Sequence, residues 1–261
     1  MEYELRVEDN AISDELRQRV WSYLGKQRWS ATWKPIGRAM HGDYVPSRDG
    51  EYAFYKWASR QSPSTYQHRA GFASDEETLK KHPVIVELWQ AINAHFNNEF
   101  ELTGHPEEIT HDPADTSWDA PTPVDTNLEA GWRVYSSAQF DESSKRTHGV
   151  HRDSPFVDDD KNWTILFCAN PEWYPTWFAD CVFYHEDPEG KTGDRQQYQN
   201  MNGVQNQNRN FPIGWPKQIV SPAPGRIIAY DGRNLHTTHP AASWGPGVPR
   251  RVVAFRVQKK S

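Results

Sequence analysis

The chain has 261 residues, enough for one large domain or two small ones with a sizeable buried core. It carries 29 lysines and arginines against 35 aspartates and glutamates, and this net charge of −6 argues against a nucleic-acid partner held by bulk charge. It has no apolar run of about 18 residues, no signal-peptide pattern at the start, and only two cysteines. Composition therefore predicts a cytoplasmic globular protein without membrane or nucleic-acid partners. It leaves the oligomeric state open.

Helical patterns are confined to the first half of the chain. Apolar residues at a spacing of four follow Ser13, a good N-cap, and predict a helix over 14–24. A second helix is expected from Pro83 to about Phe96, because proline is favoured in a first turn. Residues 1–128 are therefore expected to form a helical and loop-rich support region.

The second half has the pattern of a β-sheet protein. Short runs rich in β-branched and aromatic residues are bounded by Gly, Pro, Asn or Asp, and lie at 132–135, 163–168, 181–184, 226–230 and 251–257. Several short strands without helices between them indicate an antiparallel barrel or jelly roll. With the N-terminal helices packed outside this core, the fold class would be α+β.

A histidine and an aspartate two residues apart are candidate metal ligands, because alternate side chains of a strand point to one face. The pattern occurs at 41–43, 151–153 and 185–187. The first lies where no strand is expected, and the third is expected at the tip of a hairpin. His151 and Asp153 adjoin predicted strands and are preferred. The alternative for this pair is a solvent-facing surface ion pair.

A third ligand has to come from elsewhere, and His236 and His239 are the candidates near the C-terminus. His236 follows the predicted strand 226–230 and a tight turn over 231–234, so a hairpin could return it to the barrel mouth. Two histidines and one carboxylate suit non-haem Fe(II) and leave coordination positions open. Zinc is the competing metal, but the sequence contains no His-Glu-x-x-His motif and no cysteine set for it.

An arginine beyond the second histidine suggests that an anion binds beside the metal. Arg250 and Arg251 stand where the last predicted strand starts, and a guanidinium pointing into the barrel can hold a carboxylate through two parallel hydrogen bonds. Strand alternation groups Arg251 with Val253 and Phe255, whereas Arg250 precedes the strand. Arg251 is therefore preferred. A strand-edge arginine facing water is the alternative.

The order of these residues resembles the Fe(II)/2-oxoglutarate-dependent oxygenases, and most closely their prolyl-4-hydroxylase-like branch. The resemblance covers about residues 130–258. Its most specific stretch is the Pro-Gly-Arg strand followed by Asp-Gly-Arg-Asn-Leu-His at 224–236, which favours His236 over His239. It implies a single oxygenase domain over residues 1–261, with a double-stranded β-helix (a jelly-roll or cupin-like barrel) over 129–261 as its core.

The resemblance also implies the site residues. The implied iron ligands, which would also be the catalytic residues, are His151, Asp153 and His236. The far carboxylate of 2-oxoglutarate would pair with Arg251, and Tyr135 and Thr164 would assist in binding it. An insertion at 243–247 departs from the family pattern, so the choice between Arg250 and Arg251 stays open.

The implied reaction uses O2 and 2-oxoglutarate to hydroxylate an unactivated C–H bond, and it releases succinate and CO2. Halogenases of this superfamily replace the carboxylate ligand with Gly or Ala, so Asp153 favours hydroxylation. Desaturation, epoxidation and ring closure remain open.

The sequence says less about the substrate. The Gln/Asn-rich segment 194–210 is either a polar spacer or a lid over a polar substrate. Together with Arg133 and Arg152 it favours a small polar metabolite, such as a natural product, amino acid, nucleoside or sugar-like compound. The alternatives are a peptidyl (prolyl-type) hydroxylase and a non-enzymatic jelly-roll binding module.

Overall fold

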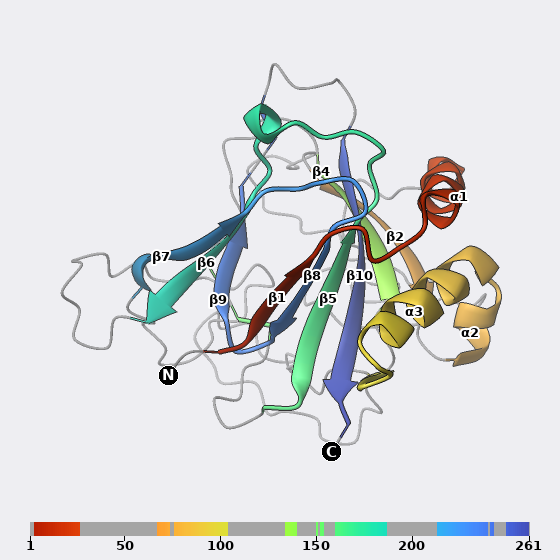
Figure 1. Cartoon of the computed structure of the whole chain (residues 1–261), viewed down its shortest axis with the longest axis horizontal. Helices are drawn as coiled ribbons and strands as arrows, with labels where there is room; N and C mark the ends of the chain where they lie inside the picture. Colours follow the sequence, from red (N-terminus) through yellow and green to blue (C-terminus); the bar gives the residue numbers. More distant parts are fainter. Residues whose placement is uncertain are drawn as a thin grey trace, which may run out of the picture.

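A computed structural model gives the fold of the protein (Figure 1). The structure describes residues 3–26, 67–73, 76–103, 134–139, 150, 152–153, 160–186, 213–239, 241–242 and 249–260. None of the described helices is long and apolar enough to cross a membrane.

Most of the described elements are strands in two antiparallel sheets. The larger sheet has the order β1-β8-β5-β10-β4-β2, with β3 also paired to β10, and the smaller has the order β7-β6-β9. The strands are β1 (Leu5–Glu8), β2 (Gln67–Ala73), β3 (Phe100–Leu102), β4 (Val134–Gln139), β5 (Asn162–Cys168), β6 (Cys181–Glu186), β7 (Ile213–Val220), β8 (Ile227–Asp231), β9 (Leu235–Thr238) and β10 (Arg250–Lys259). The helices are α1 (Asp14–Gly25), α2 (Glu76–Lys80), α3 (Pro83–His95) and a short 3-10 turn (Pro175–Trp177).

Each of the five predicted strand runs overlaps a strand of the described residues, and both predicted helices are present. The N-cap is also confirmed, because the backbone N–H of Leu16 donates to Ser13 Oγ over 3.3 Å. Helix α1 extends through Gly25 and is capped at Lys26. Each prediction succeeded where the local spacing of apolar residues matched one secondary-structure period.

Helices α1 and α3 cover one face of the larger sheet (Figure 1). Leu24 of α1 and Leu88 of α3 are fully buried in one apolar cluster with Val253 and Phe255 of β10. Packing of the helices outside the sheet is thus confirmed. Strand alternation then turns residues 250, 252, 254 and 256 of β10 to the other face of the sheet.

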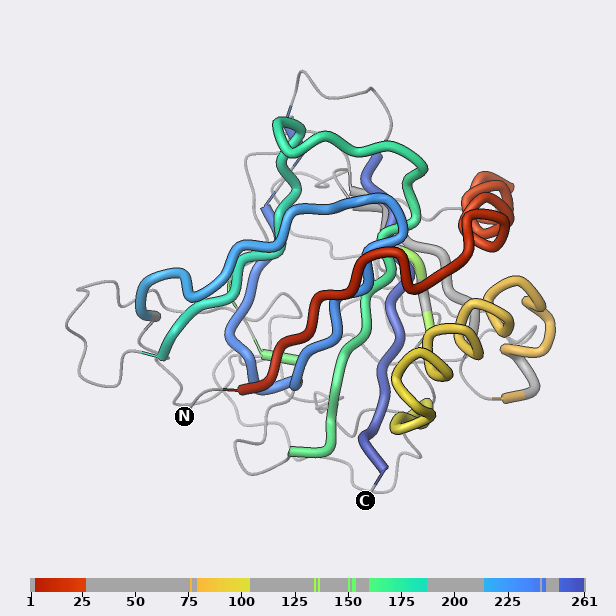
Figure 2. The backbone as a smooth tube through the Cα atoms, viewed as in Figure 1, coloured from red at the N-terminus to blue at the C-terminus, as the bar shows by residue number. Residues whose placement is uncertain are grey.

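The other face of the larger sheet meets the smaller sheet across a second apolar cluster. Phe183 of β6 packs against Tyr230 of β8 with ring centroids 5.2 Å apart, and Cys181 and Ile228 belong to the same buried cluster. In the tube view β6, β7 and β9 lie to one side of the strands β8, β5 and β10 (Figure 2). The space between the sheets is the inner side of the fold.

Two sequence predictions need correction. The N-terminal part is not only helix and loop, because it supplies β1, β2 and β3 to the larger sheet. Residues 231–234 do not close a hairpin, because β8 belongs to the larger sheet and β9 to the smaller one. Both errors have one cause: strand pairing is a long-range property that local spacing does not reveal.

Candidate metal site

Asp153 is buried between the two sheets, with 4% of its surface exposed. Its Oδ2 accepts hydrogen bonds from Thr164 Oγ1 and from the Tyr230 hydroxyl, each over 2.7 Å. Its Oδ1 accepts from the guanidinium of Arg256, which also donates to Thr164. The backbone N–H of Asp153 donates to Gly232 O over 2.8 Å. Donors from three strands therefore hold this carboxylate in a single orientation, and the Gly232 carbonyl fixes the backbone that carries it.

Strand register explains why these donors converge. Thr164 on β5 is the register partner of Tyr230 on β8 and of Arg256 on β10. Residues that pair directly across neighbouring strands point to the same side of the sheet. The three side chains therefore form one polar row on the inner face, directly against Asp153.

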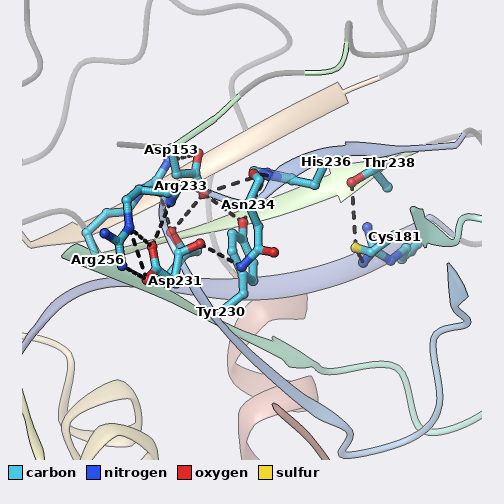
Figure 3. Close-up of polar contacts among 11 residues, drawn as sticks. Asp153, Cys181, Tyr230, Asp231, Arg233, Asn234, His236, Thr238 and Arg256 are labelled. Carbon is cyan, nitrogen blue, oxygen red and sulfur yellow. Dashed lines mark hydrogen bonds and ion pairs between the residues drawn. The ribbon is translucent and has the colours of Figure 1, made fainter. Parts of the chain in front are cut away.

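His236, on β9 of the smaller sheet, faces this row (Figure 3). Its Nδ1 lies 3.0 Å from the carbonyl oxygen of Asn234, which can only accept, so Nδ1 carries the hydrogen. In the neutral ring Nε2 then keeps its lone pair. Nε2 lies 3.2 Å from the Tyr230 oxygen and 3.7 Å from Asp153 Oδ2.

The turn between β8 and β9 holds the Asn234 carbonyl in place. The Arg233 backbone N–H donates to Asp231 Oδ1 over 2.9 Å, as in an Asx-type turn. The Asn234 side chain donates to the backbone carbonyls of Glu4 and Asp231, and its Oδ1 accepts from Lys217 Nζ over 2.9 Å. A tight Asp-Gly-Arg-Asn turn thus sets which nitrogen of His236 is available.

The pKa of the Tyr230 hydroxyl is raised well above its usual value, first by burial and then by the negative charge of Asp153. Its hydroxyl therefore remains protonated at neutral pH and acts as a donor toward Asp153.

The two candidate arginines lie on opposite faces of the larger sheet. Arg251 lies on the helix-covered face, with its guanidinium carbon 4.5 Å from the ring centroid of Trp21, and burial lowers its pKa. Arg250 is 4% exposed and points inward, where its Nη2 donates to Cys181 Sγ over 3.5 Å. The structure therefore does not bring Arg251 to Asp153 and His236, because residue 251 alternates away from the inner face.

The structure describes only some of the other predicted site residues. His151 lies outside the described residues. Tyr135 pairs with Ala254 in the sheet, but its side chain is outside the described part. Thr164 lies at the site, in contact with Asp153. Among the described residues no three His, Cys, Asp or Glu side chains gather as a metal site.

Two residues that contact Asp153, Tyr230 and Arg256, were not singled out from the sequence. Arg256 had a sequence signal, because it interrupts the apolar run Val-Val-Ala-Phe-Arg-Val of β10. A charge inside a buried strand requires a partner. Tyr230 had no such signal, because a tyrosine in an apolar strand is ordinary.

The donor set suits a divalent metal ion. Asp153 provides a carboxylate and His236 a neutral imidazole whose Nε2 faces it, and both are protected from bulk water by burial. Carboxylate and imidazole are typical ligands of non-haem iron, and a histidine ligand whose other ring nitrogen donates to a carbonyl is the usual arrangement. These residues therefore fit the metal that the sequence pattern predicted.

No protein-family model matches the chain, and no curated protein matches its sequence. The chain is similar to solved structures of 2-oxoglutarate-Fe(II) oxygenases. One is a prolyl hydroxylase from Trichoplax adhaerens in complex with a hypoxia-inducible-factor peptide fragment, at 11% identity and a TM-score of 0.46, covering 98% of this chain and 83% of that one.

Another is an oxidoreductase of the 2OG-Fe(II) oxygenase family from Burkholderia pseudomallei, at 8% identity and a TM-score of 0.47, covering 98% of this chain and 84% of that one. A third is HygX from Streptomyces hygroscopicus with nickel and 2-oxoglutarate bound, at 12% identity and a TM-score of 0.46, covering 99% and 84%. Similarity at these values does not assign an activity, because function depends on the side chains of the site.

Proposed function

We propose that the protein is a non-haem iron, 2-oxoglutarate-dependent dioxygenase that hydroxylates an unactivated C–H bond of a small polar metabolite. The observation that carries the proposal is the meeting of Asp153 and His236, two residues far apart in sequence, with His236 Nε2 turned toward the carboxylate. Both belong to the pattern that predicted an iron site. A buried imidazole and carboxylate in this arrangement suit metal binding.

His151 is proposed as the third ligand. The support comes from its neighbours: Val150 packs with Leu235, and the Asp153 backbone donates to Gly232. The chain on both sides of His151 is thus tied to the segment that carries His236. When bound, the iron with O2 and 2-oxoglutarate would supply the oxidation, which yields hydroxylated product, succinate and CO2. The residues of the chain hold, orient and shield the reactants.

We propose Arg250 rather than Arg251 as the partner of the far carboxylate of 2-oxoglutarate. Arg250 is buried on the inner face, in the same alternating set of β10 residues as Arg256. A buried guanidinium there can form two parallel hydrogen bonds with a carboxylate. Thr164 is then proposed to orient Asp153 and to act on the co-substrate only through it.

A double-stranded β-helix is the proposed form of the barrel. The connectivity supports it: β5, β8 and β10 lie in the larger sheet, while β6 and β7, between β5 and β8 in the chain, and β9, between β8 and β10, lie in the smaller one. Repeated crossing between two facing antiparallel sheets is the pattern of a jelly roll.

The experiment is turnover of 2-oxoglutarate by the purified protein loaded with Fe(II) under anaerobic conditions. Succinate release on admission of O2 is measured against a panel of polar metabolites, and product mass identifies an added oxygen. His236→Ala is expected to abolish metal binding and turnover. His239→Ala, a matched change three residues away at the end of β9, is expected to retain both.

Two results would contradict the proposal. Iron binding and full turnover in His236→Ala would reject the site, and failure of the wild-type protein to bind iron would favour a metal-free binding module. Product formed only on proline-containing peptides would replace the small metabolite with a peptidyl substrate.

A further inference from the structure

One tyrosine hydroxyl lies beside both candidate ligands that the structure describes. The Tyr230 oxygen is 2.7 Å from Asp153 Oδ2 and 3.2 Å from His236 Nε2, and these two atoms are 3.7 Å apart (Figure 3). Tyr230 is 2% exposed, so its hydroxyl has no access to bulk water. We propose, on the basis of the proposed function, that Tyr230 is a positioning residue that fixes the Asp153 carboxylate beside His236 for metal binding.

Packing alone does not require the hydroxyl. The Tyr230 ring belongs to an apolar cluster with Phe183 and Ile228, where a phenylalanine ring would bury the same surface. Burying a hydroxyl costs free energy unless the group is hydrogen-bonded. The hydrogen bond to Asp153 offsets this cost. The hydroxyl of Tyr230 therefore contributes to the site, whereas its ring contributes to the apolar core.

The hydrogens on His236 and Tyr230 define the role of the Tyr230 hydroxyl. His236 directs its one ring hydrogen, on Nδ1, to the Asn234 carbonyl, so Nε2 has no hydrogen to offer Asp153. Tyr230 has a single hydrogen and gives it to Asp153 Oδ2. Its oxygen is in contact with both the carboxylate and Nε2, two groups that face each other with lone pairs only. Through its bond to Asp153 the hydroxyl therefore fixes Oδ2 beside Nε2.

Asp153 has other side-chain donors besides Tyr230. Thr164 also donates to Oδ2, and Arg256 holds Oδ1, from the strands β5 and β10. Tyr230 contacts both candidate ligands. Partners of this kind orient ligands, and their loss typically lowers metal affinity 10- to 100-fold.

The test is Co(II) binding by the full chain, followed by chelator competition and by the visible absorption spectrum of the bound ion. Tyr230→Phe is expected to bind Co(II) about 10- to 100-fold more weakly and with an altered spectrum. Its metal-free unfolding temperature should stay close to that of wild type, because the ring is kept. Tyr23→Phe is the matched control: its hydroxyl contacts His82 on the helical side of the protein, and its affinity should equal that of wild type.

The outcomes of the Co(II) experiment distinguish a failure of this inference from a failure of the proposed function. If wild type binds Co(II) and Tyr230→Phe binds it equally or more tightly with the same spectrum, the positioning role is wrong and the proposed function stands. If wild type does not bind Co(II) at all, the proposed function fails and this inference fails with it. Weaker binding in Tyr230→Phe, with Tyr23→Phe unchanged, supports both.

Discussion

Arg250 and Arg251 are neighbours in sequence and occupy opposite environments. One points between the sheets toward Cys181, and the other stacks on Trp21 under helix α1. Adjacent residues of a strand face opposite ways, and the face that Arg251 shares with Val253 and Phe255 is the one that the helices cover. β10 begins at Arg250, one residue before the predicted start at 251.

Arg250→Met is expected to raise the KM for 2-oxoglutarate about 10- to 100-fold, because hydrogen bonds to a charged group contribute about 1.5–3 kcal/mol. Arg251→Met makes the same chemical change on the helix side and should leave that KM unchanged. Succinate formation is measured as a function of 2-oxoglutarate concentration for both. A larger effect in Arg251→Met would return the role to the residue first preferred.

Asp153 and Arg256 form a buried ion pair, with side chains 4% and 8% exposed. Removing one partner of such a pair leaves an uncompensated charge away from water. Arg256→Met is therefore expected to lower the free energy of unfolding of the metal-free protein by about 3–5 kcal/mol, measured by urea denaturation. The double variant Arg256→Met/Asp153→Leu should recover most of that loss. If the single variant is as stable as wild type, the pair does not hold the site.

At the scale of elements, strand β1 ties the start of the described chain to the site. It pairs with β8 along its whole length, and just beyond it Asp9 forms a bidentate ion pair with Arg226. The Glu4 carbonyl, next to β1, accepts from Asn234 in the turn before His236. A strand from the N-terminal part thus supports the turn that orients a candidate ligand.

The Asp9–Arg226 pair predicts a pH-dependent contribution to stability. Hydrogen bonding to Arg226 lowers the pKa of Asp9, so its stabilisation is present above the unfolded value near 3.9 and is lost as pH falls through the lower folded value. Asp9 is half exposed, and solvent screening keeps the contribution below about 1 kcal/mol. Asp9→Asn should therefore be slightly less stable than wild type at pH 7 in urea unfolding. A gap that does not narrow below about pH 4 would contradict this.

At the scale of the whole molecule, the site depends on parts of the chain that only the folded protein brings together. Asp153, β5, β8, β9 and β10 each contribute to one polar cluster between the sheets (Figure 3). The unfolded chain has no such cluster. A ligand of this cluster binds the native state selectively and stabilises it by mass action.

Metal and 2-oxoglutarate are therefore expected to raise the Tm of the wild-type protein under anaerobic conditions. Ligand at 100 times its Kd stabilises the native state by about 2.7 kcal/mol, which corresponds to a rise of roughly 5–10 °C for a chain of this size. The measurement compares Mn(II) plus 2-oxoglutarate with a chelator in thermal unfolding. His236→Ala should show no rise, and an equal rise in that variant would place binding elsewhere.

Local sequence by itself predicted half of the described elements. A four-residue apolar repeat after Ser13 predicted α1, a proline in a first turn predicted α3, and β-rich runs predicted β4, β5, β6, β8 and β10. The His-x-Asp pattern with a distant histidine selected Asp153 and His236 as candidates. The predicted helices and strands are confirmed because each depends on a residue and its near neighbours. The ligand assignments stay predictions.

Only the tertiary structure decided the rest. It placed β1, β2 and β3 in the larger sheet, separated β8 from β9, turned Arg250 inward, and brought Tyr230 and Arg256 to Asp153. Strand pairing and register depend on contacts between segments far apart in the chain. A one-residue difference in register reverses which side chains face the interior, so the composition of the site follows from the assembled sheets.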